Sequence, residues 1–148
     1  VQLQHIDGAL AARKRIYERY CTLLGDIPGI KLFHAPDNVE WNHSYFPILV
    51  EPSYPVDRDS LYEALKAKDI YSRRYFYPLI SSFSMYRHLP SARPENLPVA
   101  DEIAAKVLCL PIFPDLSEDD LLRVVAVVRE LGMPLAQPVA RAANGDIA

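Results

Sequence analysis

The distribution of glycine and proline constrains this chain more than any other feature of its sequence. It contains 13 prolines and 5 glycines, and the glycines occupy positions 8, 25, 29, 132 and 145. A loop that cradles phosphate with its backbone N–H groups needs glycine, which adopts positive φ and lets the backbone approach an anion closely. The glycine-free middle therefore excludes a P-loop and a dinucleotide-binding fingerprint there. Any anion bound by that region must be held by side chains or by helix N-termini.

The charge balance and the cysteines narrow the class of protein. The 148 residues predict one domain, and a formal net charge of −3 argues against a nucleic-acid binder, because such proteins usually carry a basic excess. The longest aliphatic run, residues 124–128, is far shorter than the roughly 18 residues of a membrane span. Two isolated cysteines indicate a reducing compartment, so we expect a cytoplasmic protein that does not enter a membrane. Because the chain starts inside a helical pattern without Met, we also expect it to be a piece of a longer protein.

The spacing of apolar residues predicts helices that alternate with short strands, in a small α/β (α+β-like) fold. We expect residues 1–24 to form a long connecting helix, residues 25–133 a small domain, and residues 134–148 a loosely ordered tail. The domain should hold a few-stranded, mainly antiparallel sheet covered by helices. The predicted strands are residues 30–33, 44–50 and 107–110, with an extended segment at 70–77; further helices are predicted at 57–67, 98–106 and 117–132.

Three residues give local detail. Asp57 and Ser117 are good N-caps for the helices that follow them, and the acidic residues after Ser117 suit the positive end of a helix dipole. Pro47 removes a backbone donor from its strand, which predicts an edge strand or a bulge.

Residues 71–79 (YSRRYFYPL) carry the most chemical information. In an extended chain alternate side chains share a face, so Arg73, Tyr75 and Tyr77 should point one way and Ser72, Arg74 and Phe76 the other. Arginine presents a planar fork of donors that suits phosphate, and tyrosine offers a ring and a hydroxyl. The segment therefore fits a phosphorylated or nucleotide-linked ligand. The alternative is a sheet segment with an aromatic face in the core and arginine stems on the surface, and spacing alone does not separate the two.

Other reactive residue types give weaker patterns. No two of the four histidines stand at a metal-ligand spacing, so we predict no metal site. Cys109 lies in an apolar strand and is expected in the core. The serines at positions 81, 82 and 84 lack the Gly-x-Ser-x-Gly context of a nucleophile.

The order of several motifs resembles a known family. A long opening helix is followed by NHSYFPILV at 42–50, a capped helix, DIYSRRYFYPL at 69–79, LPVA at 97–100, VLCLP at 107–111 and LSED at 116–119. In this order they are similar to the C-terminal (small) domain of the DegT/DnrJ/StrS-type sugar aminotransferases, which are fold-type I enzymes dependent on pyridoxal phosphate. The similarity covers nearly all of residues 1–133.

The resemblance implies a role in amino-sugar biosynthesis. Enzymes of this type are cytoplasmic homodimers that transfer an amine, here expected from glutamate, to a nucleotide-linked keto-sugar through pyridoxal 5'-phosphate. Their small C-terminal domain helps to close the active site. The family's Arg/His-Tyr-aromatic-x-Pro stretch matches residues 74–78, which implies that Arg74 and Tyr75 face the substrate, with Arg73 and Tyr77 the next candidates.

The chain departs from the full family pattern in one respect. The Schiff-base lysine of the family follows a Ser-x-x-Lys signature in the large domain, and none of the lysines here (positions 14, 31, 66, 68 and 106) has serine three residues before it. We therefore expect no catalytic or cofactor-binding residue in this chain, an inactive isolated chain, and pyridoxal phosphate bound in a longer parent with an N-terminal large domain. The alternative is a stand-alone ligand-binding or dimerising α/β module without catalysis; nucleic-acid binding through Arg73 and Arg74 fits the acidic charge least.

Overall fold

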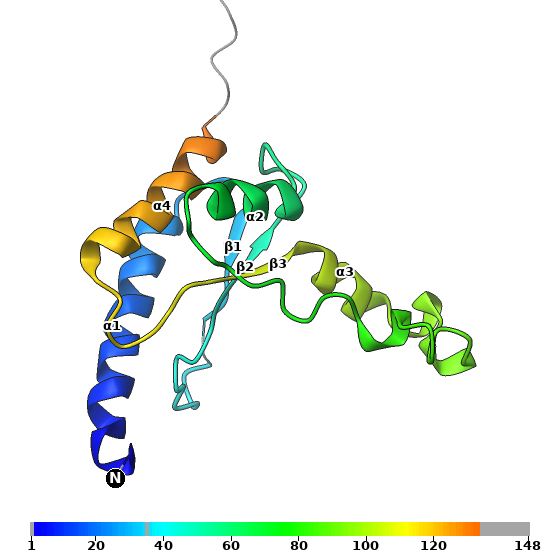
Figure 1. Ribbon diagram of the computed structural model, residues 1–148, viewed down its shortest axis with the longest axis horizontal. Helices are drawn as coiled ribbons and strands as arrows, with labels where there is room; N and C mark the ends of the chain where they lie inside the picture. The colour runs from blue at the N-terminus through cyan, green and yellow to red at the C-terminus, as the bar shows by residue number, and fades with distance from the viewer. Residues whose placement is uncertain (1, 35, 134–148) are drawn as a thin grey trace, which may run out of the picture.

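A three-stranded antiparallel sheet lies at the centre of the protein. The computed structural model describes residues 2–34 and 36–133 (Figure 1). Strands β1 (Ile30–Leu32), β2 (Phe46–Val50) and β3 (Val107–Leu110) lie in the order β1-β2-β3, and both pairs are antiparallel. This confirms the predicted few-stranded antiparallel sheet. The predicted tail, residues 134–148, lies outside the described residues, and the proposed division at residue 24 stays a prediction.

Because β2 is the central strand, the expectation that Pro47 marks an edge strand is wrong. The pairing of β2 with β1 ends at Ile48, opposite Leu32, whereas Pro47 lies opposite Cys109 of β3. Pro47 is therefore paired on one side only, which is locally the situation of an edge residue, and a missing donor is tolerated there.

Three helices build the core with one face of the sheet. Helix α1 (Ile6–Leu24), preceded by a 3-10 turn (Gln2–His5), lies beside α4 (Glu118–Gly132), and α2 (Arg58–Ala67) completes the cover (Figure 1). Alternate residues of β2 point into this core, as the period of a strand requires. The largest fully buried side chains are those of Tyr20, Leu24, Phe46, Ile48, Leu61, Leu65, Leu108, Leu121 and Val128.

Both predicted helix caps are confirmed. The Asp57 carboxylate accepts a hydrogen bond from the backbone N–H of Ser60 at 2.7 Å, and this bond lowers the pKa of Asp57. The Ser117 hydroxyl oxygen accepts from the backbone N–H of Asp120 at 3.1 Å. None of the helices in the described part of the chain is long and apolar enough to cross a membrane.

Residues 78–106 form an arm that projects away from the rest of the protein (Figure 1). Its outward limb contains the 3-10 turns η2 (Ile80–Ser82), η3 (Pro90–Ala92) and η4 (Pro94–Asn96), and α3 (Pro98–Lys106) returns to β3. Several large apolar side chains of the arm are exposed: Ile80, Phe83, Met85, Tyr86, Leu89 and Val99. The root of this arm positions the segment that the sequence singled out.

Candidate functional site

Residues 71–77 connect α2 to the arm and are fixed to the sheet at one point. Arg73 donates its backbone N–H to the carbonyl of Cys109 at 2.9 Å and accepts from the N–H of Cys109 at 2.8 Å. The predicted extended segment at 70–77 is therefore bonded to β3 through Arg73, and the chain turns at Tyr75 and Phe76. This turn divides the four predicted site residues into two groups.

The first group contains Arg73 and Tyr75. Arg73 lines a pocket of about 350 Å³ together with Ser44, Tyr45, Tyr71, Cys109 and residues 110–113. The hydroxyls of Tyr45 and Tyr75 are 3.2 Å apart, and their ring centroids are separated by 4.9 Å. The Arg73 side chain is exposed, and no ion pair among the described residues involves it. The Arg73 guanidinium and the Tyr45 phenol thus line one pocket, and the Tyr75 hydroxyl adjoins it through Tyr45. These groups can bind phosphate and hydroxyl groups.

The second group contains Arg74 and Tyr77, which pack against the start of α2. Arg74 Nη1 lies 2.9 Å from Oδ1 of Asp59, and its guanidinium carbon lies 4.3 Å from the ring centroid of Tyr62. The Tyr77 ring centroid is 5.2 Å from the guanidinium carbon of Arg74. The expected alternation, with Tyr77 on the side of Arg73, is wrong, because the turn at residues 75 and 76 brings Tyr77 back to Arg74.

Sequence reasoning missed Tyr45 and Asp59. Tyr45 immediately precedes β2, and its sequence context indicated only a strand. Asp59 lies in the first turn of α2, where an acidic residue is explained by the helix dipole alone. Their partners are 30 and 15 residues away in sequence, so no local pattern could have found them.

A second pocket, of about 650 Å³, lies between α1 and the loop before β2. His43 lines it, and its ring lies nearly parallel to that of Trp41, 14° apart at 6.3 Å. Burial and the nearby charge of Lys14 lower the pKa of His43, so the imidazole is neutral at pH 7. Among the described residues no group of three or more His, Cys, Asp or Glu side chains could hold a metal.

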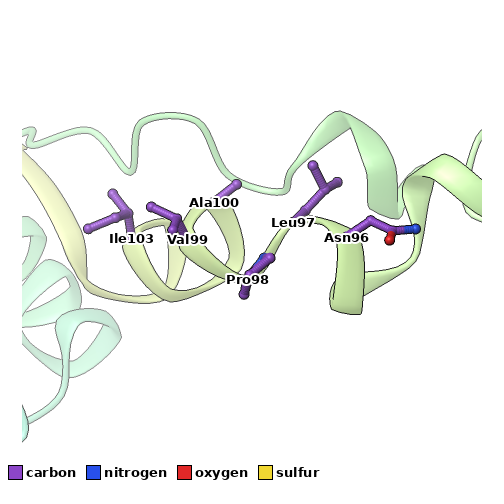
Figure 2. A pocket seen from close by; sticks show the side chains of 6 residues that line it. All are labelled: Asn96, Leu97, Pro98, Val99, Ala100 and Ile103. Carbon is purple, nitrogen blue, oxygen red and sulfur yellow. The ribbon is translucent and has the colours of Figure 1, made fainter.

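A further shallow pocket runs along the arm from η4 to α3, and Figure 2 shows that its side chains are apolar apart from Asn96. The Asn96 amide donates to the carbonyl of Pro90 at 2.8 Å. This pocket therefore lacks charged groups with which to bind a polar ligand.

The lysines do not fit the anchoring of pyridoxal phosphate. Lys106 contacts Glu102 at 2.7 Å and Glu51 at 3.0 Å, and these carboxylates raise its pKa, whereas a Schiff-base lysine needs a lowered one. The side chains of Lys14, Lys31, Lys66 and Lys68 are exposed; Lys14 stands at the rim of the pocket that His43 lines, so none of the four is buried as a Schiff-base lysine is.

Comparison with known proteins defines the class. The profile of the DegT/DnrJ/EryC1/StrS aminotransferase family matches residues 1–129, and the chain belongs to this family of sugar aminotransferases, which depend on pyridoxal phosphate. It is similar to the dTDP-4-amino-4,6-dideoxy-D-glucose transaminases of Escherichia coli (48% identity over 128 residues, 86% of this chain and 34% of the relative) and Shigella dysenteriae (41% over 131 residues, 88% and 35%). The chain therefore spans about a third of the length of these relatives.

Solved structures agree with this family. The crystal structure of DesI in the presence of its TDP-sugar product has a TM-score of 0.80 and 28% identity, covering 88% of this chain and 33% of DesI. The crystal structure of S. venezuelae DesV in complex with a ketimine intermediate has a TM-score of 0.78 and 30% identity, covering 90% of this chain and 34% of DesV. The predicted resemblance and fold class are confirmed.

Proposed function

We propose that the chain is the C-terminal, substrate-closing part of an aminotransferase that acts on a nucleotide-linked keto-sugar with glutamate as amino donor. The observation that carries this proposal is the pocket that Arg73 and Tyr45 line: the Arg73 side chain is exposed, and the Tyr45 hydroxyl lies 3.2 Å from that of Tyr75. The names of the E. coli and S. dysenteriae relatives support a dTDP-linked sugar as the substrate.

Each group of this pocket suits one part of such a substrate. The Arg73 fork can donate two parallel hydrogen bonds to a phosphate, and the two phenols can bond to sugar hydroxyls. Since no phosphate-cradling glycine loop is available in residues 30–131, binding through an arginine side chain is the expected solution. We assign Arg73 and Tyr75 to the substrate side of the segment, and propose that Arg74 and Tyr77, which pack against the start of α2, support binding without contacting the substrate.

The remaining parts of the enzyme are proposed to lie outside this chain. Pyridoxal phosphate supplies the amine-carrying chemistry when bound, and its lysine would belong to a large N-terminal domain. The assembly would be a cytoplasmic homodimer. The 148 residues alone should be inactive, because none of their lysines occupies a suitable pocket.

The test compares the full-length enzyme with the isolated chain. Full-length protein with glutamate should aminate a dTDP-linked 4-keto-6-deoxy sugar, and Arg73→Met should raise KM for that sugar by about tenfold or more, as the loss of a charge-assisted phosphate contact implies. Arg19→Met, which removes an exposed ion pair between Arg19 of α1 and Glu118 of α4, is the matched control and should leave KM unchanged. Transamination by the isolated chain, or an unchanged KM in Arg73→Met, would contradict the proposal; a gene without an upstream large domain would favour the stand-alone module.

A further inference from the structure

The ring of Tyr77 lies close to two arginines at the root of the arm. The guanidinium carbon of Arg58 is 4.6 Å from the ring centroid, and that of Arg74 is 5.2 Å away. Asp59 joins both cations, since its Oδ1 lies 2.9 Å from Arg58 Nε and 2.9 Å from Arg74 Nη1. We refer to Arg58, Asp59, Tyr62, Arg74 and Tyr77 as the Tyr77 cluster. One carboxylate and two aromatic faces thus offset the repulsion of two neighbouring cations.

Arg58 connects this cluster to the returning limb of the arm. Its side chain is buried, with 3% exposure, and Nη1 donates to the carbonyls of Ala104 at 2.9 Å and Val107 at 3.3 Å. These carbonyls lie at the junction of α3 with β3. The cluster therefore joins three parts of the fold: the start of α2, the outgoing segment through Arg74 and Tyr77, and the end of α3.

This arrangement restrains the side-chain directions at residues 73–75. The backbone of Arg73 is bonded to Cys109 in both directions, and the side chain of the next residue, Arg74, is held by Asp59 and Tyr62. With both restraints in place, the Arg73 side chain lines the pocket and Tyr75 meets Tyr45. Without the ion pair, the segment would be held only by its backbone bond to Cys109, which would open more often, and it would lose the restraint that selects this rotation.

We propose that Arg74 and Asp59 are positioning residues, which hold Arg73 and Tyr75 toward the substrate pocket through one shared ion pair; this inference rests on the proposed function. Arg74 then acts on substrate through its neighbours and does not contact it. The roles of the two arginines differ although they are adjacent in sequence, because Asp59 lies beside one and not the other.

Two substitutions separate positioning from direct contact. In the full-length enzyme Asp59→Asn and Arg74→Met should each raise KM for the dTDP-sugar by about tenfold, the double variant should be no worse than either, and Arg74→Lys should restore part of the loss. The conversion of the cofactor by glutamate alone, which needs no sugar, should keep its rate in every variant. Arg19→Met again serves as the control. If Arg74 bound the substrate directly, Asp59→Asn would leave KM unchanged or lower it, and that result would overturn the inference.

A second measurement does not depend on the substrate. In amide hydrogen exchange on the same proteins, Asp59→Asn and Arg74→Met should speed exchange at the Arg73 and Cys109 amides by about fivefold, the effect of one lost charge pair. Exchange in the β1–β2 pair should not change. Unchanged exchange at Arg73 in both variants would refute the restraint itself. If the wild-type enzyme fails to aminate the sugar while exchange is faster in the variants, the proposed function is refuted and the restraint is retained.

Discussion

Gly29, which immediately precedes β1, tests whether the chain requires glycine at the start of its sheet. Its φ is +82°, in the left-handed region, and its carbonyl accepts a hydrogen bond from the N–H of Glu51 at 2.8 Å, immediately before β1. A Cβ atom at this position would lie 2.3 Å from the backbone nitrogen of Tyr54. Both the backbone conformation and the close approach therefore require glycine here.

The cost of Gly29→Ala follows from these two facts. The left-handed conformation costs about 1–2 kcal/mol for a residue with a Cβ. The contact with Tyr54 is with backbone, so it is relieved by moving that residue, whose buried hydroxyl donates to the carbonyl of Val128 at 2.6 Å. Weakening that hydrogen bond adds about 1 kcal/mol. We expect the free energy of unfolding to fall by about 2–3 kcal/mol in total.

Urea unfolding, followed by far-UV circular dichroism, measures this loss, and Gly8→Ala provides the matched control. A Cβ at Gly8 would meet nothing within 4 Å, and the residue lies in α1, so the same substitution should raise the free energy of unfolding by about 0.5–1 kcal/mol. A loss of less than about 1 kcal/mol in Gly29→Ala would refute the reasoning. So would a change of the same sign at both positions.

Three further outcomes are expected. Arg58→Met should lower the free energy of unfolding by about 3 kcal/mol, because two buried carbonyls lose a charged donor. Arg19→Met should lower it by less than about 0.5 kcal/mol in the same urea assay. Equal losses would contradict a stabilising role for the buried Arg58 hydrogen bonds. Burial raises the pKa of Cys109 to about 11. Iodoacetamide at pH 8, followed by mass spectrometry, should therefore alkylate this thiol about 100-fold more slowly in the native than in the urea-unfolded protein. Equal rates would exclude a buried thiol. The lowered pKa of His43 means that the unfolded state binds the proton more tightly than the native state. The free energy of unfolding should therefore fall as the pH drops through the usual histidine range. Urea titrations from pH 7.5 to 5.5 should show this fall, and it should be smaller in His43→Gln.

Local chemistry predicted much of the fold. The caps at Asp57 and Ser117 depend on residues three positions apart, and both appear as hydrogen bonds. The short apolar runs at residues 46–50 and 107–110 each form a strand, because each run is bounded by residues that end a strand. The two strands are neighbours in the sheet. The prediction of an edge strand at Pro47 was wrong because a proline needs only one unpaired side at its own position. β1 ends opposite Ile48, so Pro47 has no partner on that side although β2 is the central strand.

The allocation of the two arginines lay beyond local reasoning. Arg73 and Arg74 have the same chemistry, and periodicity states only that they point in opposite directions. Which of them meets a carboxylate depends on Asp59, 15 residues earlier, and on the packing of α2 beside the segment. The turn at Tyr75 and Phe76 then places Tyr77 with Arg74, against the period of a strand. The sequence therefore singled out the segment as a candidate site but did not assign its two sides.

The abundance of proline in the arm explains why the direction of the arm is set at its root. Pro90, Pro94 and Pro98 each begin a short helical element, and the turns between them close with local hydrogen bonds such as Ala92 N–H to Leu89 at 3.0 Å and Leu97 N–H to Pro94 at 2.9 Å. Fixed φ angles and local bonds give these turns a conformation of their own without a sheet partner. The direction in which such an arm points must then be set where it joins the body, and there Arg58 contacts both limbs through Tyr77 and the carbonyls of Ala104 and Val107. A change at Arg58 should therefore reorient the arm as a unit and leave its internal turns intact.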